Sequence, residues 1–253
     1  EHRAYRPGDD LRFVDWKMYG RSDRFYLKQY EEETNLVTHL CLDVSQSMDW
    51  RSRNTGLLTK LEYAKRLAAS LALLLIRQGD AVGLICFAER VMGRLPPKGT
   101  EAHWAELVRT LVAQEPGKLT VPEEALEEIA ARVRRKGFVI LISDLLADEV
   151  ATKQALKRLS YRGQHVLVFH ILDPGERELP GTGDAVFFDP ETGDEVPARS
   201  AELRSEYRNA VAAALDEWRR VCGSHGIDYC PIGTEQPLAL SLSEYLHARA
   251  RSG

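Results

Sequence analysis

Short, almost wholly apolar runs alternate along the chain with longer segments of helical periodicity, and this alternation most constrains the fold. Four such runs, bounded by polar or turn-forming residues, are predicted to be buried strands over 36–42, 81–88, 138–142 and 165–172. A further strand is predicted over 227–232. Strands without polar alternation are typical of parallel sheets that helices cover on both faces. The sequence therefore predicts a mostly parallel sheet between two layers of helices.

Helical patterns fill the intervals between these runs. From Leu57 to Leu75 apolar residues recur at steps of three or four, and Gly79 follows as a helix stop signal. Further helices are predicted over 101–113, 121–135, 148–160, 200–224 and 238–250. Strands that alternate with helices form right-handed βαβ units. The predicted fold class is α/β, doubly wound and Rossmann-like, with one domain over 35–253.

Two regions interrupt the alternation. Residues 1–34 mix arginine, aspartate and aromatic side chains without a clear period. We expect an ordered N-terminal arm there, because its aromatic rings would be costly to leave in water. Residues 174–198 hold three turn-forming dipeptides, Pro174-Gly175, Pro180-Gly181 and Thr192-Gly193. This insertion is predicted to be a long loop that carries a small hairpin.

Charge and hydropathy exclude several classes of function. The formal net charge is -4 and the isoelectric point is about 6.0, so the chain has no general attraction to nucleic acid or anionic membranes. The longest nearly continuous apolar run, 67–76, is half of the ~20 residues that span a bilayer. The four cysteines form no Cys-x-x-Cys pair, and residues 1–12 hold no apolar leader segment. We therefore expect a cytoplasmic protein without nucleic-acid partners or membrane insertion.

The common enzyme signatures are missing from the sequence. No Gly-x-Ser-x-Gly nucleophile elbow, phosphate-binding Gly-Lys-Ser/Thr loop or Gly-x-Gly-x-x-Gly dinucleotide fingerprint occurs. The histidines are scattered, and no two have the spacing of zinc ligands. Standard hydrolase, nucleotide-binding and dehydrogenase functions therefore lack their characteristic residues.

Oxygen-bearing side chains follow two of the predicted strands. Asp43, Ser45 and Ser47 come directly after the first strand, and Ser143 and Asp144 follow the strand over 138–142. Ligands of open parallel sheets gather where the strands end at their carboxyl edge. Hard oxygen ligands of this kind suit Mg2+ or Mn2+. The sequence therefore predicts a divalent cation at this edge of the sheet.

This arrangement resembles the metal-ion-dependent adhesion site of von Willebrand factor A domains. The matching residues are Asp43, Ser45 and Ser47 for its first element, Thr120 for its second and Asp144 for its third. The resemblance implies that the serines and the threonine hold the metal directly and that the aspartates hold it largely through water. It also implies that a carboxylate from a partner protein completes the coordination sphere.

The threonine of this site has two candidates. Relatives commonly have glycine just before the threonine, whereas Leu119 stands here and cannot take positive φ angles at low cost. Thr120 is preferred because Val121 and Pro122 begin a helical pattern, which places Thr120 near an N-cap. Thr100 is the alternative.

A second resemblance covers essentially the whole chain. The runs YRPGDDLRFVDWK over 5–17 and RSDRFYLKQYEEE over 21–33 resemble the signature of the bacterial family called domain of unknown function 58, and the ending over 227–229 and 238–246 fits it too. Many relatives carry two membrane helices before the signature, and this chain looks like the shorter form without them. The resemblance implies an adaptor for MoxR-type AAA+ ATPases in the assembly of protein complexes.

Three functional hypotheses follow. The leading one is a non-enzymatic protein-interaction module that binds an acidic residue of a partner through Mg2+ or Mn2+. The second is a metal-dependent hydrolase of phosphate esters at the same edge, although neither a second carboxylate beside Asp43 nor a nearby histidine is evident as a base. The third is a scaffold without metal.

Overall fold

The computed structural model describes residues 2–4, 26–28, 36–53, 55–117, 129, 133, 137–146, 149–178, 184–188, 195–240, 242–243 and 246. The chain forms two compact units, Glu1–Asn35 and Leu36–Gly253. In the first unit, β1 (His2–Ala4) pairs with β2 (Tyr26–Lys28) in antiparallel fashion. The second unit holds the main sheet and its helices.

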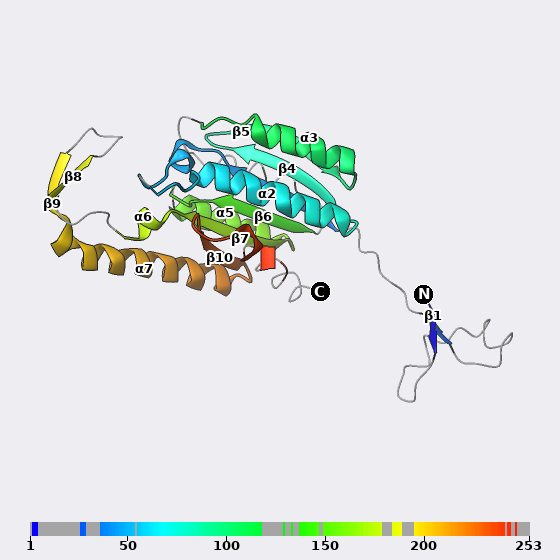
Figure 1. Ribbon diagram of the computed structural model, residues 1–253. Coiled ribbons are helices and arrows are strands. Elements are labelled where there is room, and N and C mark those ends of the chain that lie inside the picture. Colours follow the sequence, from blue (N-terminus) through cyan, green and yellow to red (C-terminus); the bar gives the residue numbers. More distant parts are fainter. Residues whose placement is uncertain are drawn as a thin grey trace. The chain divides into compact units, whose positions relative to one another are not determined.

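The structure describes a six-stranded sheet in the second unit (Figure 1). In order across the sheet, its strands are β10 (Asp228–Gly233), β7 (His165–Leu172), β6 (Phe138–Ser143), β3 (Val37–Asp43), β4 (Ala81–Phe87) and β5 (Val91–Lys98). Neighbouring strands are parallel except β5, which is antiparallel to β4. The first strand of the second unit, β3, lies inside the sheet, and later strands add on both sides of it. This confirms the predicted doubly wound fold.

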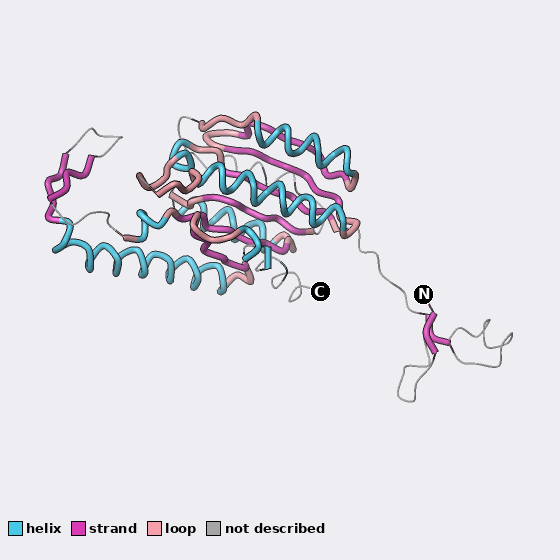
Figure 2. The backbone as a smooth tube through the Cα atoms, in the orientation of Figure 1, coloured by secondary structure: helices cyan, strands magenta, loops and turns pink. Residues whose placement is uncertain are grey.

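Helices cover both faces of the sheet, as predicted (Figures 1 and 2). One face packs against α2 (Lys60–Arg77) and α3 (Glu101–Val112), and the other packs against α5 (Glu149–Tyr161) and the C-terminal part of α7 (Ser200–Ser224). Successive residues of a strand enter opposite cores. In β3, for example, Leu40 and Leu42 lie in the first core and Cys41 lies in the second.

Local signals explain where the elements begin. The apolar pattern starts at Leu57, but α2 begins at Lys60 because the side chain of Thr59 accepts the backbone N–H of Glu62 as an N-cap.

The insertion contains α6 (Pro174–Arg177) and an antiparallel hairpin that leads into α7 (Figure 2). Its strands are β8 (Asp184–Phe188) and β9 (Glu195–Arg199). The small hairpin predicted for this insertion is present.

Other elements predicted from the sequence agree with the structure only in part. Strand β5 has no counterpart in the predicted elements, because its exposure alternates and it contains Pro96 and Pro97, which are tolerated at a sheet edge. The predicted helix over 121–135 falls mostly outside the described residues, of which Ile129 and Val133 are buried. Of the predicted helix over 238–250, the described residues are helical.

We expect Gly137→Ala to lower the free energy of unfolding by about 1–3 kcal/mol. Gly137 directly precedes β6, and a methyl group there would lie 2.2 Å from the carbonyl oxygen of Val37, so β6 and β3 would have to separate. Urea denaturation measures the change. Gly223→Ala in α7 is the control: its methyl group meets nothing within 4 Å, and alanine should stabilise the helix by about 0.5–1 kcal/mol. A stabilising effect of Gly137→Ala would contradict the packing argument.

Candidate functional site

The carboxylates predicted to meet do lie at the same edge of the sheet. Asp43 is the last residue of β3, and Asp144 follows Ser143, the last residue of β6. The two strands are adjacent and parallel, with Leu42 beside Ile142. Both carboxylates are buried, and the charge of Asp144 acts on Asp43.

Hydrogen bonds fix the orientation of Asp43. Its Oδ1 accepts the backbone N–H of Ser45 at 2.9 Å, and its Oδ2 accepts the hydroxyl of Ser143 at 2.6 Å. Burial and the negative charge of Asp144 raise the pKa of Asp43 to about 6, against the opposing effect of these hydrogen bonds. At neutral pH the buried Asp43 is therefore largely ionised beside Asp144, and a cation close to Asp43 would lower the electrostatic cost of that charge.

Two hydroxyl groups lie beside this pair. The 3-10 helix η2 (Gln46–Asp49) follows β3, and Ser45 occupies its N-cap position without a capping hydrogen bond from its side chain. The Oγ atoms of Ser45 and Ser47 are 3.0 Å apart. Neutral hydroxyls and carboxylate oxygens form the kind of ligand set that Mg2+ accepts.

Lys60 is one residue at this edge that the sequence analysis missed. It is the first residue of α2, its side chain is 0% exposed, and its Nζ lies 2.8 Å from Oδ2 of Asp144. Lys60 also forms an ion pair with Glu176 of α6. Burial lowers the pKa of Lys60, but the two carboxylates outweigh it and hold the pKa above its ordinary value. This edge therefore contains a lysine that stays protonated and positively charged at neutral pH.

A third strand, β7, ends in the same region, and the residue that follows it forms hydrogen bonds with a loop of the site. Asp173 follows β7, is fully buried, and accepts the backbone N–H groups of Ser52 at 3.0 Å and of Gly175 at 2.8 Å. Its side chain also accepts the hydroxyl of Ser52. Because Ser52 belongs to the loop between β3 and α2, Asp173 fastens this loop to the end of β7. The loop that follows the hydroxyl pair is therefore anchored to a neighbouring strand.

The two threonine candidates have different outcomes. Thr120 lies outside the described residues. Thr100 caps α3, where its side chain accepts the backbone N–H of His103 at 3.2 Å. It comes just after Lys98 of β5, which pairs with Val82 near the start of β4, whereas Asp43 pairs with Phe87 at the end of β4. Thr100 therefore lies near the end of the sheet where the parallel strands begin, opposite the strand ends that carry Asp43 and Asp144, and it does not reach the site.

The described residues fit a cation site built on hydroxyls. Among them, no group of three or more histidine, cysteine, aspartate or glutamate side chains has the geometry to hold a metal ion. A cation at this edge would therefore depend on Ser45 and Ser47, with Asp43 and Asp144 supplying negative charge behind them. The two buried aspartates next to this pair of hydroxyls are the feature that fits a cation.

The doubly wound sheet and the Asp-x-Ser-x-Ser sequence at its carboxyl edge define a von Willebrand factor A-like domain. The family model described as "Protein of unknown function DUF58" matches residues 1–217, and the chain belongs to this family. The uncharacterized protein Rv1480 of Mycobacterium tuberculosis is 29% identical over 259 residues, which cover 99% of this chain and 79% of that protein.

Solved structures show the same fold. The conserved hypothetical protein BatB from Bacteroides thetaiotaomicron has a TM-score of 0.55 at 21% identity, covering 86% of this chain and 97% of that chain. An aerotolerance-related membrane protein from Bacteroides fragilis has a TM-score of 0.58 at 19% identity, covering 85% and 99%. In the described part of this chain, no helix combines the length and apolar character needed to cross a bilayer.

Proposed function

We propose that this protein is a non-enzymatic interaction module that binds a carboxylate of a partner protein through Mg2+ or Mn2+ at the edge formed by β3 and β6. The observation that carries the proposal is the buried Asp43–Asp144 pair beside the hydroxyls of Ser45 and Ser47, whose oxygens are 3.0 Å apart. A divalent cation would supply an electrophilic centre with a position open to the partner's carboxylate.

The chain's own residues prepare this edge for a cation. Ser143 and the backbone of Ser45 hold the Asp43 carboxylate in one orientation. Nζ of Lys60 donates a hydrogen bond to Oδ2 of Asp144 and so orients the second carboxylate. Because hydroxyls carry no charge, direct ligation by Ser45 and Ser47 would leave much of the ion's charge available for the partner's carboxylate.

The surroundings of the site support binding rather than hydrolysis. A hydrolase needs a general base beside the metal. Lys60 is engaged by two carboxylates and stays protonated. His170 is buried, and its Nδ1 lies 2.5 Å from the hydroxyl of Tyr229. The resemblance to the domain of unknown function 58 supports a MoxR-type AAA+ ATPase as the partner. The four free cysteines support a cytoplasmic location.

Replacing both serines tests the cation site. We expect Ser45→Ala/Ser47→Ala to weaken Mg2+ binding at least about tenfold, because each alanine removes a direct oxygen ligand. Isothermal titration with MgCl2 measures the affinity. Ser205→Ala/Ser224→Ala is the matched control, since both serines lie exposed on α7. Equal Mg2+ affinity in the wild type and the Ser45/Ser47 variant would overturn the proposed site.

Partner capture and turnover separate the remaining alternatives. Co-purification of a MoxR-type ATPase that requires Mg2+ and is lost in the double alanine variant is the expected result. Capture that persists with chelator would indicate a scaffold without metal. Hydrolysis of p-nitrophenyl phosphate that depends on Mg2+ and disappears in Asp43→Ala would instead favour an enzyme.

A further inference from the structure

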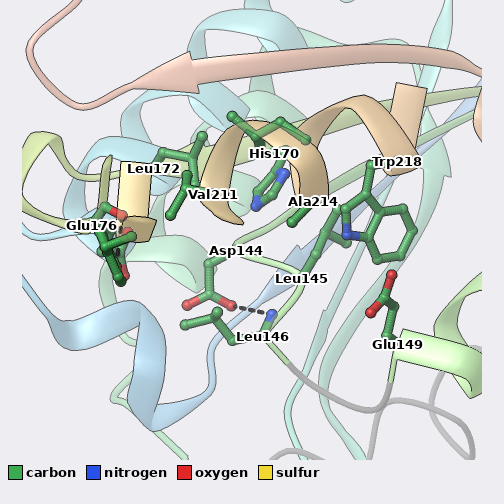
Figure 3. Close-up of a pocket in the computed structure, with 12 residues that line it drawn as sticks. Asp144, Leu145, Leu146, Glu149, His170, Leu172, Glu176, Val211, Ala214 and Trp218 are labelled. Carbon is green, nitrogen blue, oxygen red and sulfur yellow. Dashed lines mark hydrogen bonds between the residues drawn. The ribbon is translucent and has the colours of Figure 1, made fainter. Parts of the chain in front are cut away.

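A cavity of about 490 Å3 opens beside the proposed cation site (Figure 3). It lies between the ends of β6 and β7, helix α6 and the inner face of α7. Apolar side chains form most of its wall, among them Leu145, Leu172, Val211 and Trp218. Leu146 also lines the cavity and is 65% exposed. This volume is in the range of sites that bind ligands or large side chains.

The charged groups that face the cavity are all acidic. Of the described residues that line it, Asp144, Glu149 and Glu176 carry carboxylates and none is a lysine or an arginine. Asp144 and Glu176 share the single ammonium group of Lys60, which is 0% exposed. Glu149 lies 2.5 Å from Lys153. The carboxylates outnumber these two ammonium groups, so the cavity has an excess of negative charge.

His170 and Tyr207 also line the wall, and both are engaged in hydrogen bonds. Nδ1 of His170 lies 2.5 Å from the hydroxyl of Tyr229, and the hydroxyl of Tyr207 donates to the backbone carbonyl of Glu176 at 2.9 Å. Because the carboxylates of the wall outnumber the ammonium groups that pair with them, an additional cation would be stabilised inside the cavity.

We propose that the cavity receives a lysine or arginine side chain of the partner protein. Such a side chain has an apolar stem and a cationic end, which match the apolar wall and the acidic groups of the cavity. The exposed side chain of Leu146 offers an apolar contact at the cavity for the residues that flank this basic residue. The inference rests on the proposed function, since Asp144 faces both the cavity and the cation site. A partner bound there would place an acidic and a basic side chain close together.

A short lysine peptide tests the charge preference. We expect acetyl-Leu-Lys-Leu-amide to bind the full chain at least about tenfold more tightly than the same peptide with glutamate or norleucine in place of lysine. Isothermal titration in buffer with chelator measures the affinities. Equal binding of the three peptides would overturn the proposal. Binding of n-hexylammonium without binding of the lysine peptide would overturn a protein partner as the source of the cation.

Matched variants place the binding in the cavity. Ala214 lines the cavity and Ala213 does not, and both are exposed on α7. We expect Ala214→Trp to fill the cavity and weaken peptide binding at least about tenfold, and Ala213→Trp to change it less than about twofold. Glu149→Gln should weaken binding, and Glu206→Gln, on the exposed surface of α7, should not. Unchanged binding in Ala214→Trp would overturn the assignment.

The cation-site variant separates this inference from the proposed function. If Ser45→Ala/Ser47→Ala loses Mg2+ but binds the lysine peptide as the wild type does, both proposals are supported. Wild-type protein that binds Mg2+ but not the peptide would contradict the cavity proposal alone. Wild-type protein that binds the peptide but not Mg2+ would contradict the cation site alone.

Discussion

Lys60→Met is expected to lower the free energy of unfolding by about 3–5 kcal/mol. The side chain of Lys60 is 0% exposed and that of Asp144 is 2% exposed, so removal of the ammonium group leaves a buried carboxylate without its partner. Glu176 loses the same partner, but its side chain is 20% exposed and can recover part of its hydration. Urea denaturation followed by circular dichroism measures the loss.

Two further variants test whether the loss comes from the buried ion pair. One replaces a surface lysine, and the other also removes the charge left unpaired. Lys98→Met, on the exposed side of β5, should change the free energy of unfolding by less than about 0.5 kcal/mol. Adding Asp144→Asn to Lys60→Met should recover part of the loss, because the unpaired charge is then removed. A loss below about 1 kcal/mol in Lys60→Met, or no recovery in the double variant, would show that the ion pair is not important for stability.

The main sheet could be predicted because its signal is local. The apolar runs of β3, β4, β6 and β7 are continuous and short, and the helices between them have a clear period. Strand β5 lacked that signal. Its residues alternate in exposure, and its position depends on pairing with β4, which no local pattern reveals.

Only the site residues that lie at or directly after a strand end could be predicted from the sequence. Asp43 and Asp144 directly follow β3 and β6, so the topology alone brings them together. Lys60, Asp173 and Glu176 reach the region through hydrogen bonds and ion pairs over long sequence separations. One sequence signal was available for Lys60: a cation in the first turn of a helix opposes the helix dipole, which suggests that the residue has another partner.

The cavity could not be predicted from the sequence. Its wall combines residues of α7 with the ends of β6 and β7, and α7 is separated from these strands by the α6 and hairpin insertion. Helical periodicity shows that Val211, Leu215 and Trp218 share one face of α7. It does not show that Trp218 is buried in the core while Val211 and Leu215 are only partly buried, or that all three line a cavity.

Asp43→Asn is expected to stabilise the protein in the absence of divalent cations, by about 2–3 kcal/mol at pH 8. Burial and Asp144 raise the pKa of Asp43 from its ordinary value of 3.8 to about 6, so the folded protein binds a proton more tightly than the unfolded chain does. The stability that this proton provides is fully present below about pH 4 and is lost as the pH rises through about 6. Asparagine is neutral throughout, so the variant does not lose stability in this pH range.

Mg2+ should reverse the ranking of the two proteins. A cation that binds only the folded state stabilises it increasingly with the logarithm of its concentration, by about 4.1 kcal/mol at about one thousand times the Kd, which exceeds the advantage of the variant without cation. We expect wild type at pH 8 to gain this stability and Asp43→Asn to gain little, because the charge behind Ser45 and Ser47 is reduced. Urea denaturation at pH 4, 6 and 8, with chelator and with Mg2+, measures both effects. Asp216→Asn, an exposed change on α7, should follow the wild type. Parallel pH profiles for wild type and Asp43→Asn would mean that Asp43 is not destabilised by its buried neighbour, and the electrostatic reason for a cation at this edge would be lost.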